Sequence, residues 1–214
     1  MIPFKSRLVP GSRWVLLTAM ILASFGASGF FLHAPSTLQS LAENSDSRSE
    51  LLKNWRNGDV IVLVRHAERC DRSDAPCLSS ADGITVRARS VASDLGHSFD
   101  AMGLANTDIA SSPLLRARQT AEGMFGSTPA EEEWLFHCRG AMLARALRYK
   151  QPHRNLILVT HSECIRDLES AMSNPYPAIA DYASSVFVID NGREAPSLLG
   201  YLDADQWHAV VSTR

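Results

Sequence analysis

The chain has little of several features that would assign it to a class at once. It carries only 4 cysteines and 7% aromatic residues in 214 positions, and its formal net charge is −2. So small a charge gives no overall basic field, which argues against nucleic acid as a partner. There is no internal repeat or low-complexity tract, and 45% of the residues are hydrophobic. One ordinary globular domain is therefore expected.

Metal-ligand spacing is also absent. The cysteines form no Cys-x-x-Cys pair and the histidines form no His-x-x-x-His pair. Structural zinc sites are commonly built from such pairs. The sequence therefore favours a protein without a metal or cofactor over a zinc protein.

One long hydrophobic run lies near the N-terminus, over residues 14–32, and three basic residues precede it. This order is typical of an export signal and places the following domain in the periplasm. The run approaches the roughly 20 residues of a spanning helix, and no Ala-x-Ala cleavage site is evident. We expect either a cleaved signal peptide or an inner-membrane anchor within residues 1–33.

The stretch after this run is rich in Ser, Asn and Asp and is typical of a linker. We predict a linker over residues 34–54, with a short helix leading to Trp55. The main folded domain is then expected over residues 55–214.

The four cysteines of an exported domain are expected to form two disulfides. Three pairings are formally open. Cys70 and Cys77 bracket a short polar loop that a local bridge would stiffen, which favours this pair. The remaining pair would be Cys138 with Cys164, which lies just after His161.

Four short aliphatic or β-branched runs are typical of buried strands, at residues 60–64, 107–110, 156–160 and 185–189. Helical patterns lie between them, at residues 85–99, 113–124, 140–149 and 162–172. This alternation predicts a three-layer α/β/α sandwich around a largely parallel sheet.

Two of these strands end in a histidine, His66 after Arg65 and His161 after Thr160. Ligands of open α/β sheets bind beyond the carboxyl ends of the strands, so both histidines are expected in one site. An unprotonated imidazole nitrogen can attack phosphorus. Arg65, Arg116 and His161 could then surround the phosphoryl oxygens, because the planar guanidinium matches phosphate geometry.

The motifs resemble those of the histidine phosphatase superfamily, the branch that contains phosphoglycerate mutase. Arg65-His66-Ala67 is similar to its Arg-His-Gly signature, and Thr160-His161 matches its second histidine. Residues 112–121 resemble its second arginine motif, with Arg116 in the catalytic position. The resemblance covers residues 59 to 190 and implies a phosphohistidine on His66 without a metal.

A longer run over residues 65–73, 77–79 and 83–86 resembles the periplasmic lipopolysaccharide core heptose(II)-phosphate phosphatases. That subgroup carries cysteines that match Cys138 and Cys164, which supports the same two bridges. Arg69 and Arg72 would then contact a second phosphate or an acidic sugar, or simply face solvent. Ser162 and Glu163 replace the Gly-Gly pair common in the superfamily, and both are candidate substrate-binding residues.

The general acid of this superfamily is often a glutamate, and the matching position here is His137. An imidazole can protonate a leaving oxygen near neutral pH. Glu68 and Glu163 lie beside motif residues and are rival donors. The alternative role of Glu68 is a salt bridge to Arg65 or Arg69, and that of His137 is a half-buried loop residue.

The sequence thus predicts a phosphomonoesterase with a phosphohistidine intermediate that acts on heptose phosphate of the lipopolysaccharide core. One alternative is a broad-specificity or protein phosphohistidine phosphatase. Another is a non-catalytic module that binds phosphorylated glycans. A mutase is less favoured, because the chain lacks long insertions that would close over its substrate.

Overall fold

The computed structural model describes residues 38–174 and 180–212 of the chain. Residues 36–214 form one compact unit. The signal peptide or anchor predicted for residues 1–33 lies outside the described residues. Within the described part, every helix is too short or too polar to cross a bilayer.

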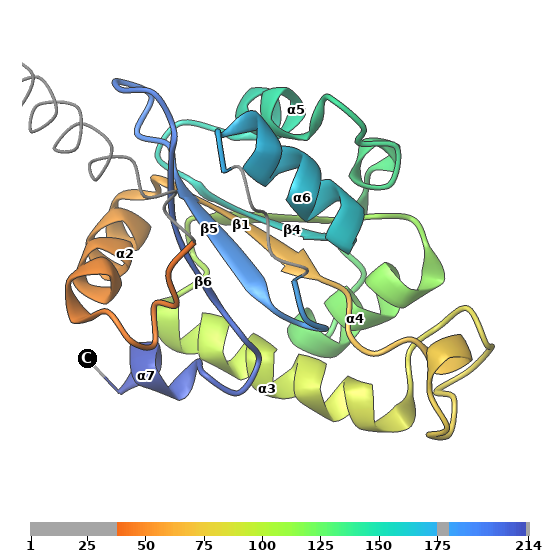
Figure 1. Cartoon of the computed structure of the whole chain (residues 1–214). Coiled ribbons are helices and arrows are strands. Elements are labelled where there is room, and N and C mark those ends of the chain that lie inside the picture. Colours follow the sequence, from red (N-terminus) through yellow and green to blue (C-terminus); the bar gives the residue numbers. More distant parts are fainter. Residues whose placement is uncertain (1–37, 175–179, 213–214) are drawn as a thin grey trace, which may run out of the picture. The chain divides into compact units, whose positions relative to one another are not determined.

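A six-stranded sheet with the order β3-β2-β4-β1-β5-β6 forms the centre of this unit (Figure 1). Four strands run parallel, namely β1 (Val60–Arg65), β2 (Thr107–Ser111), β3 (Ala130–Glu131) and β4 (Asn155–Thr160). The antiparallel strands β5 (Ser185–Ile189) and β6 (Ser197–Leu202) complete the sheet beside β1. The largely parallel sheet is therefore confirmed. Sequence reasoning missed only β3, which has two residues, and β6.

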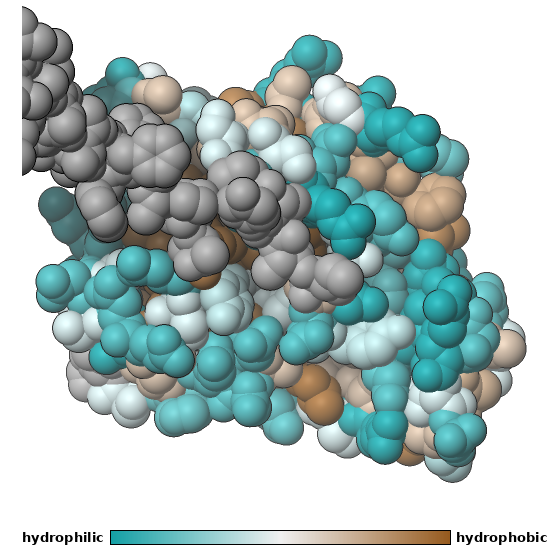
Figure 2. All heavy atoms as spheres, in the orientation of Figure 1, coloured by the Kyte–Doolittle hydropathy of each residue, from teal (hydrophilic) through white to brown (hydrophobic). Residues whose placement is uncertain are grey.

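Helices cover both faces of the sheet, because successive strand residues point to opposite sides. Val60, Val62 and Val64 of β1 pack in one core, and Ile61 and Leu63 pack in the other. The first core is closed by α2 (Ser45–Asn57), α3 (Val86–Met102), α4 (Leu115–Phe125) and α7 (His208–Val211). The second is closed by α5 (Met142–Tyr149) and α6 (Ser162–Ala171). This is the predicted three-layer sandwich, and hydrophilic side chains predominate over α2 and α3 in Figure 2.

The start of α3 follows local capping chemistry, whereas α4 begins without a side-chain cap. Thr85 caps α3 by accepting a hydrogen bond from the backbone N–H of Ala88 at 3.1 Å. Pro113 was expected inside the first turn of the next helix. Leu114 is extended, however, so α4 begins only at Leu115.

The segment predicted as a linker is folded against the domain over much of its length. Asn44 caps α2, and Leu41 and Leu51 are fully buried in the core. Trp55 donates its indole N–H to the carbonyl of Gly103 at 2.9 Å. Because the stretch is mostly polar, its sequence did not indicate that Leu41 and Leu51 pack against the sheet.

Candidate active site

The strands β1 and β4 lie side by side in the sheet (Figure 1), and a histidine follows each of them. Arg65 of β1 pairs in register with Thr160 of β4, so the residue that follows each strand end is a histidine at the same level. The ring centroids of His66 and His161 lie 5.1 Å apart. The helix α6 starts directly after His161, and α4 starts beside Arg116. Both helix N-termini add partial positive charge for an anion.

The hydrogen bonds of His66 fix its tautomer. Its Nδ1 lies 2.8 Å from the carbonyl oxygen of Ala67, which can only accept, so Nδ1 carries the proton. The Nε2 atom accepts from Nε of Arg116 at 3.2 Å. Burial, together with the nearby His161, Arg116 and Arg65, lowers the pKa of His66 to about 3, against the opposing carbonyl of Ala67. The ring is therefore neutral at physiological pH, with the Nε2 lone pair directed at Arg116.

Arg65 and Arg116 are half-buried cations beside this nitrogen. The Arg65 guanidinium lies 4.0 Å from the centre of the Tyr182 ring and donates to the carbonyl of Ala180. Burial lowers the pKa of both arginines below its ordinary value. Arginine nevertheless keeps its charge in proteins, so the pair supplies fixed positive charge.

His161 is almost fully buried, at 2% exposure. Its Nε2 lies 2.8 Å from the hydroxyl of Ser112, and its Nδ1 has no hydrogen-bond partner within the described residues. Burial first, and then Arg116, lowers its pKa to about 4. This second neutral imidazole completes a site with Arg65, His66 and Arg116.

The loop after β1 carries the two other predicted substrate-binding arginines. Arg69 is paired with both carboxylate oxygens of Asp71, and Arg72 in the short helix η1 (Cys70–Arg72) is exposed. The disulfide Cys70–Cys77 closes this loop. The second bridge, Cys138–Cys164, joins the segment before α5 to α6, so the structure contains both expected pairings.

The three candidate proton donors have different surroundings. Glu68 accepts from Arg87 and from Thr85, and hydrogen bonds from Arg87 above all lower its pKa to about 2. Its ionic partner is thus Arg87 and neither of the two expected arginines. His137 is 71% exposed, with its Nε2 4.0 Å from Glu133.

Glu163 lies near His161 and Arg116. Burial opposes ionisation of its carboxyl, but its own backbone N–H, His161, the hydroxyl of Ser162 and Arg116 hold its pKa below the ordinary value. His137 and Glu163 line one pocket with His161. Glu163 is suited to accept hydrogen bonds, and His137 is the exposed imidazole beside the site.

Four contacting residues were not singled out by sequence reasoning. Ser112 bonds His161, and Thr120 accepts from the backbone N–H of Ala67 while donating to the carbonyl of Arg116. Gln119 links α4 to the loop after β1 through Ile84 and Ser79. Three of them, Ser112, Gln119 and Thr120, belong to the motif at residues 112–121, and this motif could have indicated that they lie at the site. Tyr182 belongs to no motif.

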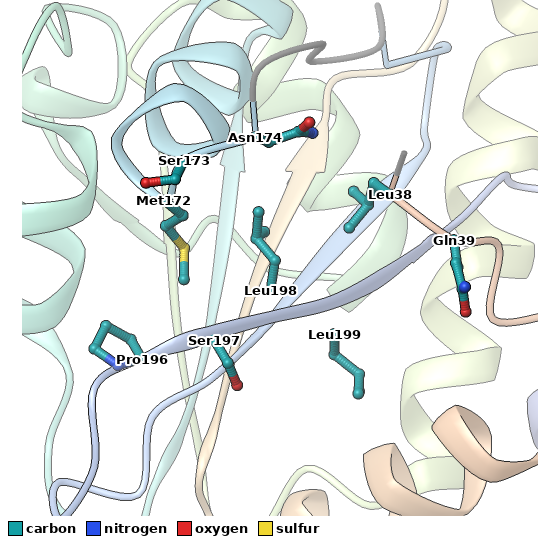
Figure 3. Close-up of a pocket in the computed structure, with 9 residues that line it drawn as sticks. All are labelled: Leu38, Gln39, Met172, Ser173, Asn174, Pro196, Ser197, Leu198 and Leu199. Carbon is teal, nitrogen blue, oxygen red and sulfur yellow. The ribbon is translucent and has the colours of Figure 1, made fainter. Parts of the chain in front are cut away.

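A different pocket lies beside β6 and the end of α6, and it contains none of the residues discussed above (Figure 3). Its lining comes from residues 38–39, 172–174 and 196–199. In the described ranges, no three His, Cys, Asp or Glu side chains are grouped to hold a metal ion.

Comparison with known proteins gives relatives in sequence and in fold. No family model matches the chain. The sequence is 37% identical over 149 residues to the lipopolysaccharide core heptose(II)-phosphate phosphatase of Escherichia coli O139:H28, and the match covers 68% of this chain and 73% of that protein.

Two solved structures share the fold. The protein histidine phosphatase SixA complexed with tungstate has a TM-score of 0.55 at 14% identity, and the match covers 68% of this chain and 97% of that one. The putative phosphohistidine phosphatase SixA from Agrobacterium tumefaciens has a TM-score of 0.52 at 16% identity, covering 68% and 99%. These matches confirm the fold predicted from the sequence.

Proposed function

Because the chain belongs to the lipopolysaccharide core heptose(II)-phosphate phosphatase family of histidine phosphatases, we propose that it hydrolyses a phosphomonoester through a phosphohistidine on His66. The observation that carries this assignment is the state of the His66 ring. Its Nδ1–H is held by the carbonyl of Ala67, and its pKa of about 3 keeps Nε2 unprotonated. An imidazole in this state is a nucleophile without prior loss of a proton.

In the first step, Nε2 of His66 attacks phosphorus and the bond from phosphorus to the leaving oxygen breaks. The phosphate oxygens replace Nε2 as acceptors of Arg116, while Arg65 and His161 contact the other oxygens. Fixed donors of this kind stabilise the charge that spreads over the transferring group. The leaving oxygen takes a proton from a general acid.

We assign the acid to His137. It shares a pocket with His161, and it is an exposed imidazole whose Nε2 lies 4.0 Å from Glu133. Glu68 and Glu163 are less suited, because their pKa values lie below the ordinary carboxyl value. In the second step, water attacks phosphorus, the bond to Nε2 breaks, and His137 takes the proton from that water.

The substrate that this proposal favours is heptose phosphate in the lipopolysaccharide core, the ester named for the Escherichia coli relative. Action on this glycan also favours a periplasmic location, with residues 1–33 as a signal peptide or an inner-membrane anchor through residues 14–32. Two disulfides in one domain fit an oxidising compartment. Other phosphomonoesters remain the alternative substrate class.

The test is phosphate release from purified lipopolysaccharide by the full chain, with and without a chelator. We expect release that survives chelation and is lost in His66→Ala. A matched control is His97→Ala, which removes an exposed histidine on α3. A trapped phosphoenzyme should be acid-labile and base-stable, as phosphohistidine is. Turnover that persists in His66→Ala contradicts the assignment of the nucleophile.

If the parent protein cleaves aryl phosphate or a phosphohistidine peptide but not lipopolysaccharide, the substrate assignment is wrong and the mechanism stands. If it cleaves no ester yet binds phosphorylated glycan, and His66→Ala still binds, the chain is a binding module. Each result selects one of the functions considered from the sequence.

A further inference from the structure

A pocket of about 340 Å³ opens beside His161, lined in part by Phe136, His137, Arg139 and Glu163. His161 also contacts the ring of His66, so this pocket adjoins the phosphate-binding groups. This space is therefore open to a group attached to a phosphate that is bound beside His66 and His161.

Phe136 is an unusually exposed aromatic residue for such a place. It is 41% exposed, and among the described residues only Val86 and Val91 of α3 are comparably exposed large apolar side chains. Its ring centroid lies 4.7 Å from that of His137 and 5.4 Å from that of His161, the latter in an edge arrangement. These contacts hold the ring in place and leave apolar surface open within a pocket, where ligands commonly bind.

The loop that carries Phe136 is attached to α6. The disulfide Cys138–Cys164 joins them covalently. The carboxylate of Asp167 accepts from the backbone N–H groups of Gly140 at 2.6 Å and Met142 at 3.0 Å. A loop fixed in this way loses little conformational freedom when a ligand binds to it.

Arg139 supplies an unused cation at the same pocket. It is exposed, and within residues 38–174 and 180–212 it makes no ion pair or side-chain hydrogen bond. A guanidinium of this kind can bind an anionic group through two parallel hydrogen bonds. The nearby Glu163 carboxylate can only accept, which suits a hydroxyl donor.

We propose that Phe136, Arg139 and Glu163 form the leaving-group subsite, and that it takes a sugar ring bearing a further anionic group. The apolar C–H face of the sugar stacks on Phe136, Arg139 pairs with the anionic group, and Glu163 accepts from a hydroxyl. This inference rests on the proposed function, because the sugar is the leaving group of the phosphate attacked by His66.

The experiment compares two substrates of the full chain. One is the phosphorylated core oligosaccharide from deacylated lipopolysaccharide, and the other is glycerol phosphate, which has neither a ring nor a second anionic group. The measured quantity is the ratio of kcat/KM for the two substrates. Phe136→Leu keeps apolar bulk against His161 but removes the flat ring, and Phe136→Trp restores a flat ring.

We expect Phe136→Leu to lower the ratio roughly two- to tenfold, mainly through KM for the oligosaccharide, and Phe136→Trp to retain it. Arg139→Ala should lower it about tenfold, with a smaller loss at high salt. The control variants Val91→Ala and Arg89→Ala on α3 should keep the parent ratio.

Equal losses on both substrates, or an unchanged ratio, would overturn the subsite. Absence of turnover of either substrate by the parent contradicts the proposed function and leaves the subsite to a binding measurement. In that case, the deciding experiment is calorimetric titration of the parent and of Phe136→Leu with the same phosphorylated core oligosaccharide. Binding weakened in the variant supports the subsite, and equal or absent binding rejects it.

Discussion

His66 and His161 should make the protein less stable in mild acid. Burial is the main reason that their pKa values fall to about 3 and about 4 in the folded protein. The unfolded chain protonates both rings near the ordinary value of about 6.5. As the pH falls below that value, the unfolded state binds protons at both histidines and the folded state does not. The free energy of unfolding therefore decreases.

The size of this effect follows from the pKa difference. At about pH 5 both rings are still neutral in the folded protein. In the unfolded chain, protonation of each histidine stabilises the unfolded state by roughly 2 kcal/mol relative to neutral pH. The two histidines together therefore remove about 4 kcal/mol from the free energy of unfolding between about pH 7.5 and pH 5.

Two substitutions isolate the contribution of each ring. His66→Asn keeps an amide donor for the carbonyl of Ala67, and His161→Gln keeps an amide group for the hydroxyl of Ser112. Urea unfolding followed by circular dichroism gives the free energy of unfolding at both pH values. Each variant should lose about 2 kcal/mol less than the parent on acidification. Other titrating groups contribute equally to both proteins and cancel in this difference.

His97→Ala is the matched control, because His97 is exposed on α3 and should leave the pH dependence as in the parent. If both site variants show the parent's acid sensitivity, the two imidazoles are not held neutral by the fold. That result would also remove the support for an unprotonated Nε2 as nucleophile.

Three other predictions concern catalysis and stability. Arg116→Ala should lower kcat for phosphate release by about 10²–10³, and Arg116→Lys should restore little of it, because lysine lacks the planar fork; full rescue by lysine would refute a geometric role. Selective loss of Cys138–Cys164, as in a Cys→Ser double variant, should cost roughly 3 kcal/mol for its 26-residue separation, measured by urea unfolding; an unchanged midpoint would contradict this. Burial raises the pKa of Glu169 to about 7, so the parent should lose about 3 kcal/mol as the pH rises from about 4.5 through 7, and Glu169→Gln should abolish that loss; an identical profile in the variant would argue against a buried neutral carboxyl.

Much of the central sheet could be predicted, because a buried parallel strand needs an apolar run on both faces. The runs at 60–64 and 156–160 became β1 and β4 with shifts of one residue. The two-residue strand β3 has no such signal, since its pairing with β2 is decided by the neighbouring backbone. Residues 38–54 show a related limit, because two buried leucines in a polar stretch carry little periodicity.

Part of the candidate site could be predicted from local motifs. Arg65, His66, Arg116 and His161 follow strand ends or begin helices, so their convergence could be inferred from the topology of an α/β sheet. The pairing of Glu68 with Arg87 could not be inferred in this way, because Arg87 belongs to α3, which the loop after β1 brings near Glu68. The contact between Tyr182 and Arg65 could not be predicted either, because the two residues are far apart in the sequence.

The sequence by itself determined the fold class, the family and the set of candidate site residues, because these depend on motifs and on hydrophobic runs that are local in the chain. Only the tertiary structure decided the protonation of His66 and His161, the partner of Glu68 and the pocket of Phe136 and Arg139. Each of these depends on burial or on contacts between residues distant in sequence. Desolvation and hydrogen-bond geometry exist only once the strands and helices have packed.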